Sequence, residues 1–361
     1  MSEGLRGNDS SECGQGPLAA LEGSRDELTA VAIGLNAMAT LDACLRAIRR
    51  ACEPLGGARL IYVDGGSKDD SVRIAEGMGV EVIRLDTTKP TAAKGRNAGW
   101  RAAATPLVHF VDSDTVLEPD WLLRGIGEIQ KDPKIASLFG QLIEANPTGS
   151  IYNRICGFDW YIPPGDWRMC GGNALFRRAA LVEADGFDEA LRAGEEPDLC
   201  WRLRQRGWRI VCADALMARH DLGMAGFSDY WRRAIRSGYA YAEIGLRFAR
   251  TSDRLWFPEF AKNLSTLPVG LTLALGAVLL GGLRATAVLA VLVAGALSWK
   301  TFKLRRRIQP LQIRLLYVIH LAFTKIPLFF GTLRFLLERW LRRSRRDSGP
   351  APGGEGANRP R

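Results

Sequence analysis

The segment PLVHFVDSD, residues 106–114, decides the predicted fold, because an apolar run ends there in two aspartates. Two earlier segments, LTAVAIGLN (28–36) and RLIYVDGGS (59–67), pass from apolar to polar residues in the same way. Further stretches repeat apolar residues at helical spacing over residues 40–52, 69–78 and 91–104. Short apolar strands that alternate with helices predict an α/β fold, in which a mostly parallel sheet carries helices on both faces.

Polar side chains stand at the predicted carboxyl ends of these strands, where ligands of open α/β sheets bind. Asn36, Asp64, Asp112 and Asp114 follow the apolar runs. Two carboxylates one residue apart offer hard oxygen ligands, which suit Mg²⁺ or Mn²⁺. The alternative for this pair is an aspartate-rich turn with a helix cap near Asp120.

Two common nucleotide-binding motifs are missing from the sequence. No GxxxxGK[ST] segment is present, and the first strand leads into GLNAMAT rather than GxGxxG. The sequence therefore favours neither a P-loop nor a dinucleotide fold.

The net charge of +10 over 361 residues is unevenly distributed. Residues 300–361 hold 15 Lys and Arg against three acids, a net of +12, whereas residues 1–299 hold 34 against 36, a net of −2. Nucleic-acid binding by the folded body would need a basic surface there. We therefore predict no nucleic-acid partner.

The cysteines and the N-terminal segment indicate the cellular compartment in which the protein is found. Seven cysteines form no CxxC pair, a pattern that suits free thiols in reducing surroundings. Residues 1–27 are rich in Gly, Ser and acids and lack a basic start followed by an apolar run. We expect a disordered leader there rather than a signal peptide.

Six segments, in this order, resemble the motifs of bacterial membrane-associated family-2 glycosyltransferases: IGLN, YVDGGSKDDS, KGRNAGWRAA, HFVDSDTVLEPDWL, CGGNALFRRAALVEADGFDEAL and GEEPDLCWRLRQRGWRI. The resemblance covers residues 28 to about 241. It implies a GT-A fold and an inverting, hexosyltransferase-like enzyme that uses a nucleotide-diphosphate sugar and a divalent metal.

The resemblance also implies a donor site. Its members are Asn36, Asp64, Lys94, Arg96, Asp112, Gly172 and Asn173. Asp64 would accept a hydrogen bond from the base, usually uracil, so a UDP-sugar is favoured. Lys94 and Arg96 would lie along the nucleotide and diphosphate, with a solvated helix face as the alternative. Gly171–Asn173 would lie near the sugar, although a structural turn explains the glycines equally well.

The metal ligands implied by the resemblance are Asp114 directly, Asp112 as its partner, and His220 from the C-terminal side, holding Mg²⁺ or Mn²⁺. His220 follows strands predicted at 208–214 and 215–218, and a purely structural histidine is the alternative there. His109 is expected in the core, since it lies within an apolar strand.

The segment Glu195–Leu199 resembles the family's EDxxL motif, whose second acid is the general base. By that alignment Glu196 is the base, Glu195 its neighbour and Asp198 the second candidate, although this chain has Glu where Asp is usual. An acidic helix start is the alternative, since acids favour helix N-termini. Arg202 is expected to pair with Glu195 or Asp198. Residues 146–168 would form the acceptor side, with Trp160 among its aromatic residues, or would pack in the core or against a membrane.

Residues 264–299 carry a single charge, Arg284. One helix of that length would be about 54 Å long, against a hydrocarbon core of about 30 Å. A split at residues 281–284 gives two short apolar helices. We predict a transmembrane hairpin over 264–299, with one tilted span as the alternative.

The predicted hairpin divides the rest of the chain. We expect a GT-A catalytic domain at 28–245 and a linker at 246–263. Residues 300–343 are predicted as basic interfacial amphipathic helices, broken near Pro327, that bind anionic head groups. A disordered basic tail is expected at 344–361.

An even number of crossings keeps the catalytic domain and the basic tail together on the cytoplasmic side of the inner membrane. A lipid-linked or glycan acceptor, in the synthesis of a cell-envelope polysaccharide, fits that position. The sequence lacks the QxxRW motif of processive synthases, so one sugar per event is expected. The alternative is a non-catalytic nucleotide-sugar-binding membrane scaffold.

Overall fold

The computed structural model describes residues 26–347, with side chains through residue 342. The expected leader and tail therefore lie almost wholly outside the described residues. The body is built on one nine-stranded sheet in the order β3-β2-β1-β4-β8-β6-β9-β5, with β7 paired to β9. Its strands are β1 Leu28–Gly34, β2 Arg59–Asp64, β3 Glu81–Arg84, β4 Leu107–Asp112, β5 Thr115–Leu117, β6 Ile135–Glu144, β7 Gly165–Trp167, β8 Ala174–Arg177 and β9 Arg209–His220.

The sheet is parallel through its first four strands and mixed beyond them. β3, β2, β1 and β4 run parallel, as the βαβ pattern predicts. β8 runs antiparallel to both β4 and β6, while β9 runs parallel to β6. Six of the seven residues of β1 are buried, which shows that both faces of the sheet are covered. The fold is thus the predicted α/β class, with a mixed sheet.

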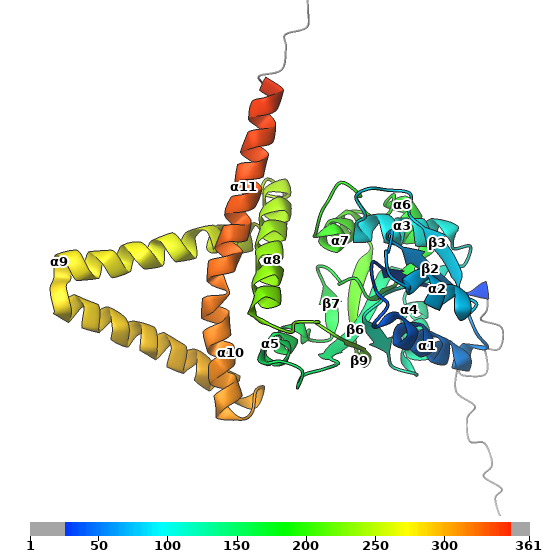
Figure 1. Ribbon diagram of the computed structural model, residues 1–361, viewed down its shortest axis with the longest axis horizontal. Helices are drawn as coiled ribbons and strands as arrows, with labels where there is room; N and C mark the ends of the chain where they lie inside the picture. The colour runs from blue at the N-terminus through cyan, green and yellow to red at the C-terminus, as the bar shows by residue number, and fades with distance from the viewer. Residues whose placement is uncertain (1–25, 348–361) are drawn as a thin grey trace, which may run out of the picture.

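Helices of the body connect and cover these strands (Figure 1). They are α1 Leu41–Cys52, α2 Ser71–Gly77, α3 Ala92–Ala102, α4 Trp121–Gln130, α5 Ile151–Cys156, α6 Arg178–Glu183 and α7 Glu195–Gln205. α1 buries one apolar face that includes Leu41, Leu45 and Ile48, as its spacing predicts. His109 is fully buried and accepts a hydrogen bond from Trp121 Nε1 at 2.8 Å, so the core position expected for it is confirmed.

One predicted pair of strands is wrong. Residues 209–220 form the single strand β9, instead of two strands at 208–214 and 215–218. The register of β9 against β6 shifts between Phe139 and Leu142. These irregularities let one strand continue through the break in its apolar pattern. β9 therefore ends at His220, opposite Thr115 of β5.

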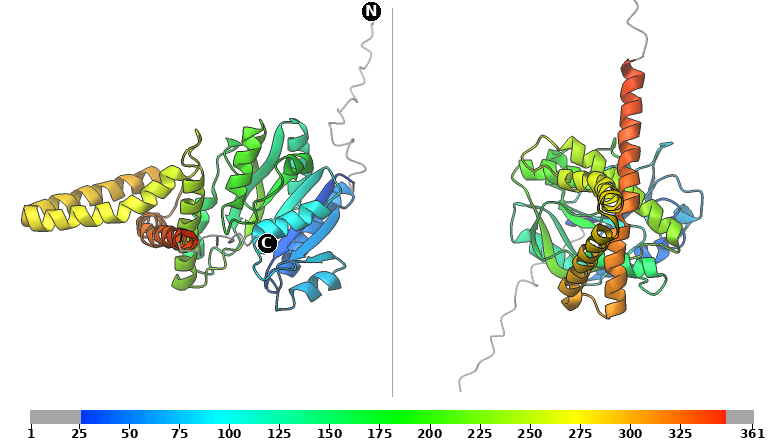
Figure 2. Two further views of the ribbon diagram at one scale, coloured as in Figure 1. Left: turned by 90° about the horizontal axis from the view of Figure 1, so that it is seen from above. Right: turned by 90° about the vertical axis from the view of Figure 1, so that its left-hand side faces the viewer.

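The C-terminal part consists of α8 Phe227–Arg247, α9 Phe257–Lys303, α10 Leu311–Phe323 and α11 Lys325–Asp347. α9 bends sharply at Gly282, where φ is 58° and ψ is −155°, into two arms that project from the body (Figures 1 and 2). The apolar side chains of the arms face outward, and Leu280 at the bend is 92% exposed. By length and composition, two helical segments, 257–306 and 311–342, could cross a membrane.

The boundaries in this part differ from those expected. α9 begins at Phe257, inside the segment expected as a linker, and continues past residue 299 to Lys303. The break between α10 and α11 lies at Thr324, three residues before Pro327. Pro327 therefore falls in the first turn of α11, where its missing N–H removes no helical hydrogen bond.

α8 joins the body to the outer helices, and it lies alongside α11 and against α9 (Figure 1). Two glycines allow the contact with α11. A Cβ on Gly238 would lie 2.2 Å from the carbonyl oxygen of Leu328, and a Cβ on Gly331 would lie 2.1 Å from that of Ile235. We call this contact the α8–α11 seam. On the side of the body, Trp201 of α7 packs on Phe248, directly after α8, with ring centroids 4.7 Å apart.

Candidate active site

Three potential metal ligands meet at the carboxyl end of the central strands. Asp112 ends β4, Asp114 lies in the turn before β5, and His220 ends β9. β5 pairs with β9 so that Thr115 lies opposite His220, which brings His220 into contact with Asp114, 106 positions away. One ligand atom from each lies within 4.8 Å of the other two. Two carboxylates and an imidazole in this arrangement fit a divalent cation, and the imidazole suits Mn²⁺ better than Mg²⁺.

His220 is held by its neighbours. Its Nε2 lies 2.9 Å from Asp114 Oδ1, and Trp160 stacks on its ring with centroids 4.9 Å apart. Burial pushes the pKa of His220 down, but the hydrogen bond and charge of Asp114 outweigh burial and raise it. The carboxylate of Asp114 therefore stabilises a proton on the imidazole of His220. A metal ion that binds this imidazole must displace that proton.

Asp112 is fixed by the turn at residues 171–173. Asn173 Oδ1 accepts the backbone N–H of Asp112 at 2.8 Å, and Asn173 Nδ2 lies 3.3 Å from Asp112 Oδ2. A Cβ on Gly172 would lie 2.8 Å from Asp112 Oδ2 and 2.1 Å from Arg96 Nη2. Any side chain at this position would force Arg96 or Asp112 to move, so the turn packs Gly172 and Asn173 directly against Asp112.

Arg96, on α3, connects the metal ligands to the acidic motif. Its Nη2 lies 2.9 Å from Asp112 Oδ1, and its Nη1 lies 2.9 Å from Glu195 Oε1 and 3.1 Å from Glu196 Oε1. The Arg96 side chain is 3% exposed, so the solvated helix face considered for it is wrong. Lys94 is half-buried, and its Nζ donates to Thr87 Oγ1 at 2.9 Å. Of the two residues, only Arg96 reaches the carboxylates.

Glu196 has the properties of a base near neutral pH. Burial and then the charge of Glu195 raise the pKa of Glu196 to about 7, against the opposing charge of Arg96. A carboxylate with a pKa near the working pH can take a proton efficiently. Its partner Glu195 is 7% exposed and accepts a hydrogen bond from Arg96.

Asp198 is placed differently from Glu196. It is 1% exposed, with Arg202 Nε 2.8 Å from Oδ2 and Arg247 Nε 3.1 Å from Oδ1. Of the two partners expected for Arg202, the structure shows Asp198. Two guanidinium groups therefore hold the carboxylate that sequence reasoning kept as the second candidate base.

The residues predicted to bind the nucleoside form a compact pair of loops. Asp64 is buried, and its Oδ2 accepts the backbone N–H groups of Gly66 and Ser67, both at 2.9 Å. Asn36 Oδ1 accepts the N–H of Lys68 at 2.9 Å, and the N–H of Asn36 donates to Ser67 Oγ at 2.8 Å. These bonds tie the loops after β1 and β2 together.

A cavity of about 210 Å³ opens beside these loops. Its lining runs from Ile33–Leu35 and Gly65 to Gly95 of α3 and then to Asp112–Asp114. The cavity therefore reaches from the predicted nucleoside loops to the predicted metal ligands, although Asp64 and Asn36 are not part of its lining.

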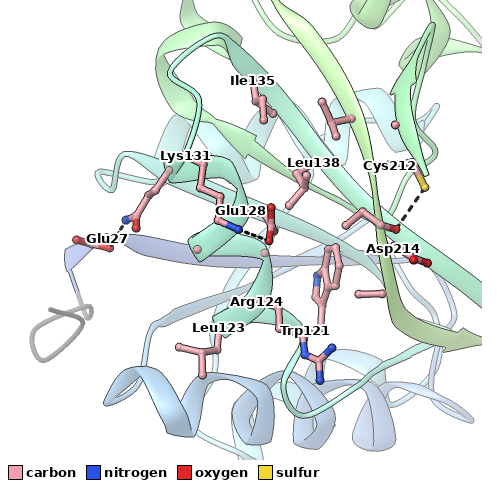
Figure 3. A pocket seen from close by; sticks show the side chains of 17 residues that line it. Glu27, Trp121, Leu123, Arg124, Glu128, Lys131, Ile135, Leu138, Cys212 and Asp214 are labelled. Carbon is pink, nitrogen blue, oxygen red and sulfur yellow. Dashed lines mark hydrogen bonds and ion pairs between the residues drawn. The ribbon is translucent and has the colours of Figure 1, made fainter. Parts of the chain in front are cut away.

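A larger cavity, of about 1050 Å³, lies elsewhere, between α4 and β9 (Figure 3). Trp121, Cys212 and Asp214 are among its lining residues. None of the predicted site residues lines it.

Arg233 of α8 was not found by sequence reasoning. It is largely buried, close enough to Asp114 and Asp159 to feel both charges, and lines a third cavity beside Trp160. No motif in the segment DYWRRAIRSGYA distinguishes Arg233 from its neighbours Arg232 and Arg236. Only the packing of α8 shows which of the three arginines turns inward.

Comparison with known proteins gives a consistent result. Residues 31–183 match the model of the family described as Glycosyl transferase family 2. The Pre-mycofactocin glycosyltransferase of Mycobacterium tuberculosis H37Rv is 30% identical over 190 residues, which cover 48% of this chain and 40% of that protein. The Succinoglycan biosynthesis protein ExoA of Rhizobium meliloti is 26% identical over 223 residues, covering 53% and 63%. The chain thus spans less than two thirds of the length of either relative.

A solved structure shares the fold. The mannosyltransferase PcManGT from Pyrobaculum calidifontis, in complex with GDP-Man and Mn²⁺, matches with a TM-score of 0.64 at 18% identity. The match covers 87% of this chain and 88% of that one. At this identity the likeness concerns the fold.

Proposed function

Because residues 31–183 match the model of glycosyl transferase family 2, we propose that this chain is an inverting, metal-dependent glycosyltransferase. Its donor is a nucleotide-diphosphate sugar, with a UDP-sugar favoured, and its acceptor is a hydroxyl group. The observation that carries the proposal is the position of Arg96, which contacts both Asp112 and Glu196. The Arg96 guanidinium thereby holds Asp112, the proposed metal ligand, close to Glu196, the proposed general base.

The reaction forms a bond between the acceptor oxygen and the anomeric carbon and breaks the bond from that carbon to the diphosphate. Glu196 takes the proton of the acceptor hydroxyl while the carbon is attacked on the face opposite the diphosphate. A divalent ion bound by Asp112, Asp114 and His220 would neutralise the leaving diphosphate. Arg96 keeps Glu196 within reach of Asp112 and balances part of the charge of the three acids it contacts.

The donor is placed by the loops after β1 and β2. The bonds between Asn36 and residues 67–68 hold the two loops at the mouth of the 210 Å³ cavity. Asp64 Oδ2 accepts the N–H groups of Gly66 and Ser67 in the loop after β2. Asp64 is also the proposed hydrogen-bond acceptor for the nucleotide base. Gly172 and Asn173, which pack against Asp112, are the proposed residues on the sugar side of the site.

We place the enzyme at the cytoplasmic face of the inner membrane. The outward apolar side chains of α9 and the basic residues 305–307 beyond it support this location. Separating membrane and soluble fractions, followed by protease digestion of sealed vesicles of each orientation, tests it. Cleavage of the body in right-side-out vesicles would place the catalytic face outside and contradict the assignment.

Calorimetric titration of the purified full chain with UDP, with and without Mn²⁺, tests the donor site. We expect metal-dependent binding that Asp114→Ala abolishes. A mass-spectrometric screen of nucleotide sugars for metal-dependent hydrolysis then identifies the donor. Metal-independent UDP binding, unchanged in Asp114→Ala, would overturn the proposal.

Glu196→Gln tests the base. This variant is expected to bind UDP normally and to lose transfer by a factor of about 100 to 10,000, the usual contribution of a general base. Glu128→Gln on the surface of α4, where Glu128 pairs only with Lys131 among the described residues, is the matched control. Normal turnover by Glu196→Gln would move the role of base to another acid, whereas donor binding without turnover in the unmodified chain would identify a scaffold.

A further inference from the structure

A third cavity, of about 530 Å³, lies where the outer helices join the body. Its walls come from the 3₁₀ turn Gly157–Trp160, from α8, from both ends of α9, from α10 and from the start of α11. Segments up to about 170 residues apart in sequence converge on it. This cavity, which we call the basal cavity, is separate from the donor cavity between β1 and α3.

Four cations line the basal cavity: Arg233, Lys262, Lys300 and Lys325. None of them forms an ion pair within residues 26–342, although Lys262 and Lys300 lie close enough to Lys325 to repel it. Among the described lining residues the one carboxylate is Asp159, whose oxygens already accept Tyr317 OH at 2.6 Å and face His320 Nε2 at 3.4 Å. The cavity thus gathers four cations beside one lining carboxylate, while Glu259 acts on Lys325, and Asp159 and Asp114 on Arg233, by charge without forming an ion pair.

Arg233 is the most deeply set of the four. Burial and the charge of Arg236 lower the pKa of Arg233, and the charges of Asp159 and Asp114 offset this only in part, so the guanidinium is suited to a further counter-charge. A guanidinium presents a planar fork of donors that matches phosphate oxygens, and ammonium groups add compact positive charge. One guanidinium and three ammonium groups around a cavity are suited to a phosphate or diphosphate.

The position of the basal cavity indicates where such a phosphate comes from. Lys262 and Lys300 lie at the bases of the two arms of α9, and each arm runs from there to the bend at Gly282. At 1.5 Å per residue the arms between lysine and bend are about 30 Å and about 27 Å long, close to the hydrocarbon thickness of a bilayer. The two arms project together from the body (Figure 2). Because Lys262 and Lys300 at their bases line the cavity, a lipid lying along the apolar arms would place its head group there.

The basal cavity also shares a wall with the metal ligands. Trp160 lines the cavity and stacks on His220 with centroids 4.9 Å apart. Arg233 is near enough to Asp114 for their charges to interact. A group attached directly to a phosphate in the cavity would therefore lie beside the predicted metal site.

We propose that the basal cavity binds the phosphate or diphosphate of a lipid-borne acceptor, and that the acceptor enters the active site past Trp160. This inference rests on the proposed function, since it names the class of acceptor for the same site. It assigns Arg233, Lys262, Lys300 and Lys325 to acceptor recognition rather than to adhesion to anionic membranes.

Binding of the full chain, reconstituted in phosphatidylcholine nanodiscs, tests the inference. The discs contain a polyprenyl phosphate, the matching polyprenol without phosphate, or phosphatidylglycerol, and inorganic phosphate and diphosphate are added as free competitors. We expect the polyprenyl phosphate to protect Lys262, Lys300 and Lys325 from amine-reactive labelling, while polyprenol and phosphatidylglycerol do not. Equal protection by phosphatidylglycerol would show general adhesion, and equal protection by free phosphate would show a soluble ligand; either would overturn the inference.

Charge removal gives a second test. Lys300→Gln and Lys325→Gln are each expected to weaken polyprenyl phosphate binding about tenfold or more, since charge-assisted hydrogen bonds are among the strong ones. Lys303→Gln is the matched control, because Lys303 lies on the same helix, is exposed and stacks over Trp299 outside the cavity. Equal weakening by Lys303→Gln would contradict the assignment, and the lipid comparison in the unmodified chain decides the matter if a variant does not fold.

UDP binding separates the two proposals. If the chain binds UDP with Mn²⁺ but does not distinguish polyprenyl phosphate from polyprenol, the acceptor assignment alone fails. If UDP binding is absent as well, the proposed function fails with it. Lys300→Gln should leave UDP binding unchanged, because Lys300 does not line the donor cavity.

Discussion

Replacing Gly172 by alanine puts a methyl group into the most crowded point of the site. The new Cβ would lie 2.1 Å from Arg96 Nη2 and 2.8 Å from Asp112 Oδ2. Ordinary carbon contacts begin near 3.4 Å, so the guanidinium must retreat by about 1.3 Å and the carboxylate oxygen by about 0.6 Å. The φ angle of Gly172 lies outside the left-handed region, so the effect comes from contact rather than from backbone strain.

Arg96 cannot retreat freely, because three carboxylates hold it at 2.9 to 3.1 Å and its side chain is 3% exposed. Overfilling a packed interior in this way costs about 1–3 kcal/mol of stability. Misplacement of catalytic groups by about 1 Å lowers turnover by about 100-fold. We expect Gly172→Ala to lose metal affinity and turnover together, because Asp112 and Arg96 move together.

The control lies at the neighbouring position. A Cβ on Gly171 meets no atom within 4 Å, so Gly171→Ala should stay within about 0.5 kcal/mol of the unmodified chain. The measurements are the Mn²⁺ dependence of UDP binding by calorimetry, the transfer rate and the unfolding midpoint of all three proteins. If Gly172→Ala matched Gly171→Ala in Mn²⁺ affinity and turnover, the close packing of Gly172 on Arg96 and Asp112 would have no functional weight and our reasoning would be refuted.

Three further predictions follow from the same contacts. Since burial raises the pKa of Glu196 to about 7 and the base must be deprotonated, kcat/KM should rise with pH through about 7 and level off above it; a profile flat from about pH 6 to 8 would contradict this role. Asp114→Asn removes the negative charge that helps to raise the pKa of His220, so in metal-free protein the imidazole should titrate at lower pH, as followed by NMR. Gly331→Ala brings a Cβ to 2.1 Å from a backbone carbonyl of α8 and should lower stability in detergent by about 1–3 kcal/mol, whereas Gly127→Ala, open within α4, should be neutral or stabilising; equal melting temperatures would show that the helices separate without cost.

Sequence patterns predicted the elements of the body because each apolar run ends in polar residues at one edge of the sheet. Asp112, Asp114 and His220 were named in advance, and the pairing of β5 with β9 explains their meeting. A contact between residues 106 positions apart, such as Asp114 and His220, has no local signal, so the resemblance supplied His220 and the residues alone did not.

The role of Arg96 shows what patterns do not reveal. Its spacing in α3 is equally compatible with a surface position, and only the packed structure brings it to Glu195, 99 residues further along the chain. The same holds for β9, whose apolar pattern is interrupted while pairing with β6 continues. Side chains that meet through tertiary packing alone, as Arg233 and Lys325 do at the basal cavity, leave no trace in local sequence.

The α8–α11 seam has a geometric consequence for substrate choice. With glycines in place of side chains, the two helices meet backbone to backbone and cannot slide or tilt as side chains in a looser interface allow. At its other end α8 is fastened to α7 through Trp201 and Phe248. If α9 lies in a bilayer, the base on α7 is then held at a constant height above the lipid surface. Under the proposed function, the distance from the lipid surface to the proposed base would then decide which acceptor hydroxyls can react.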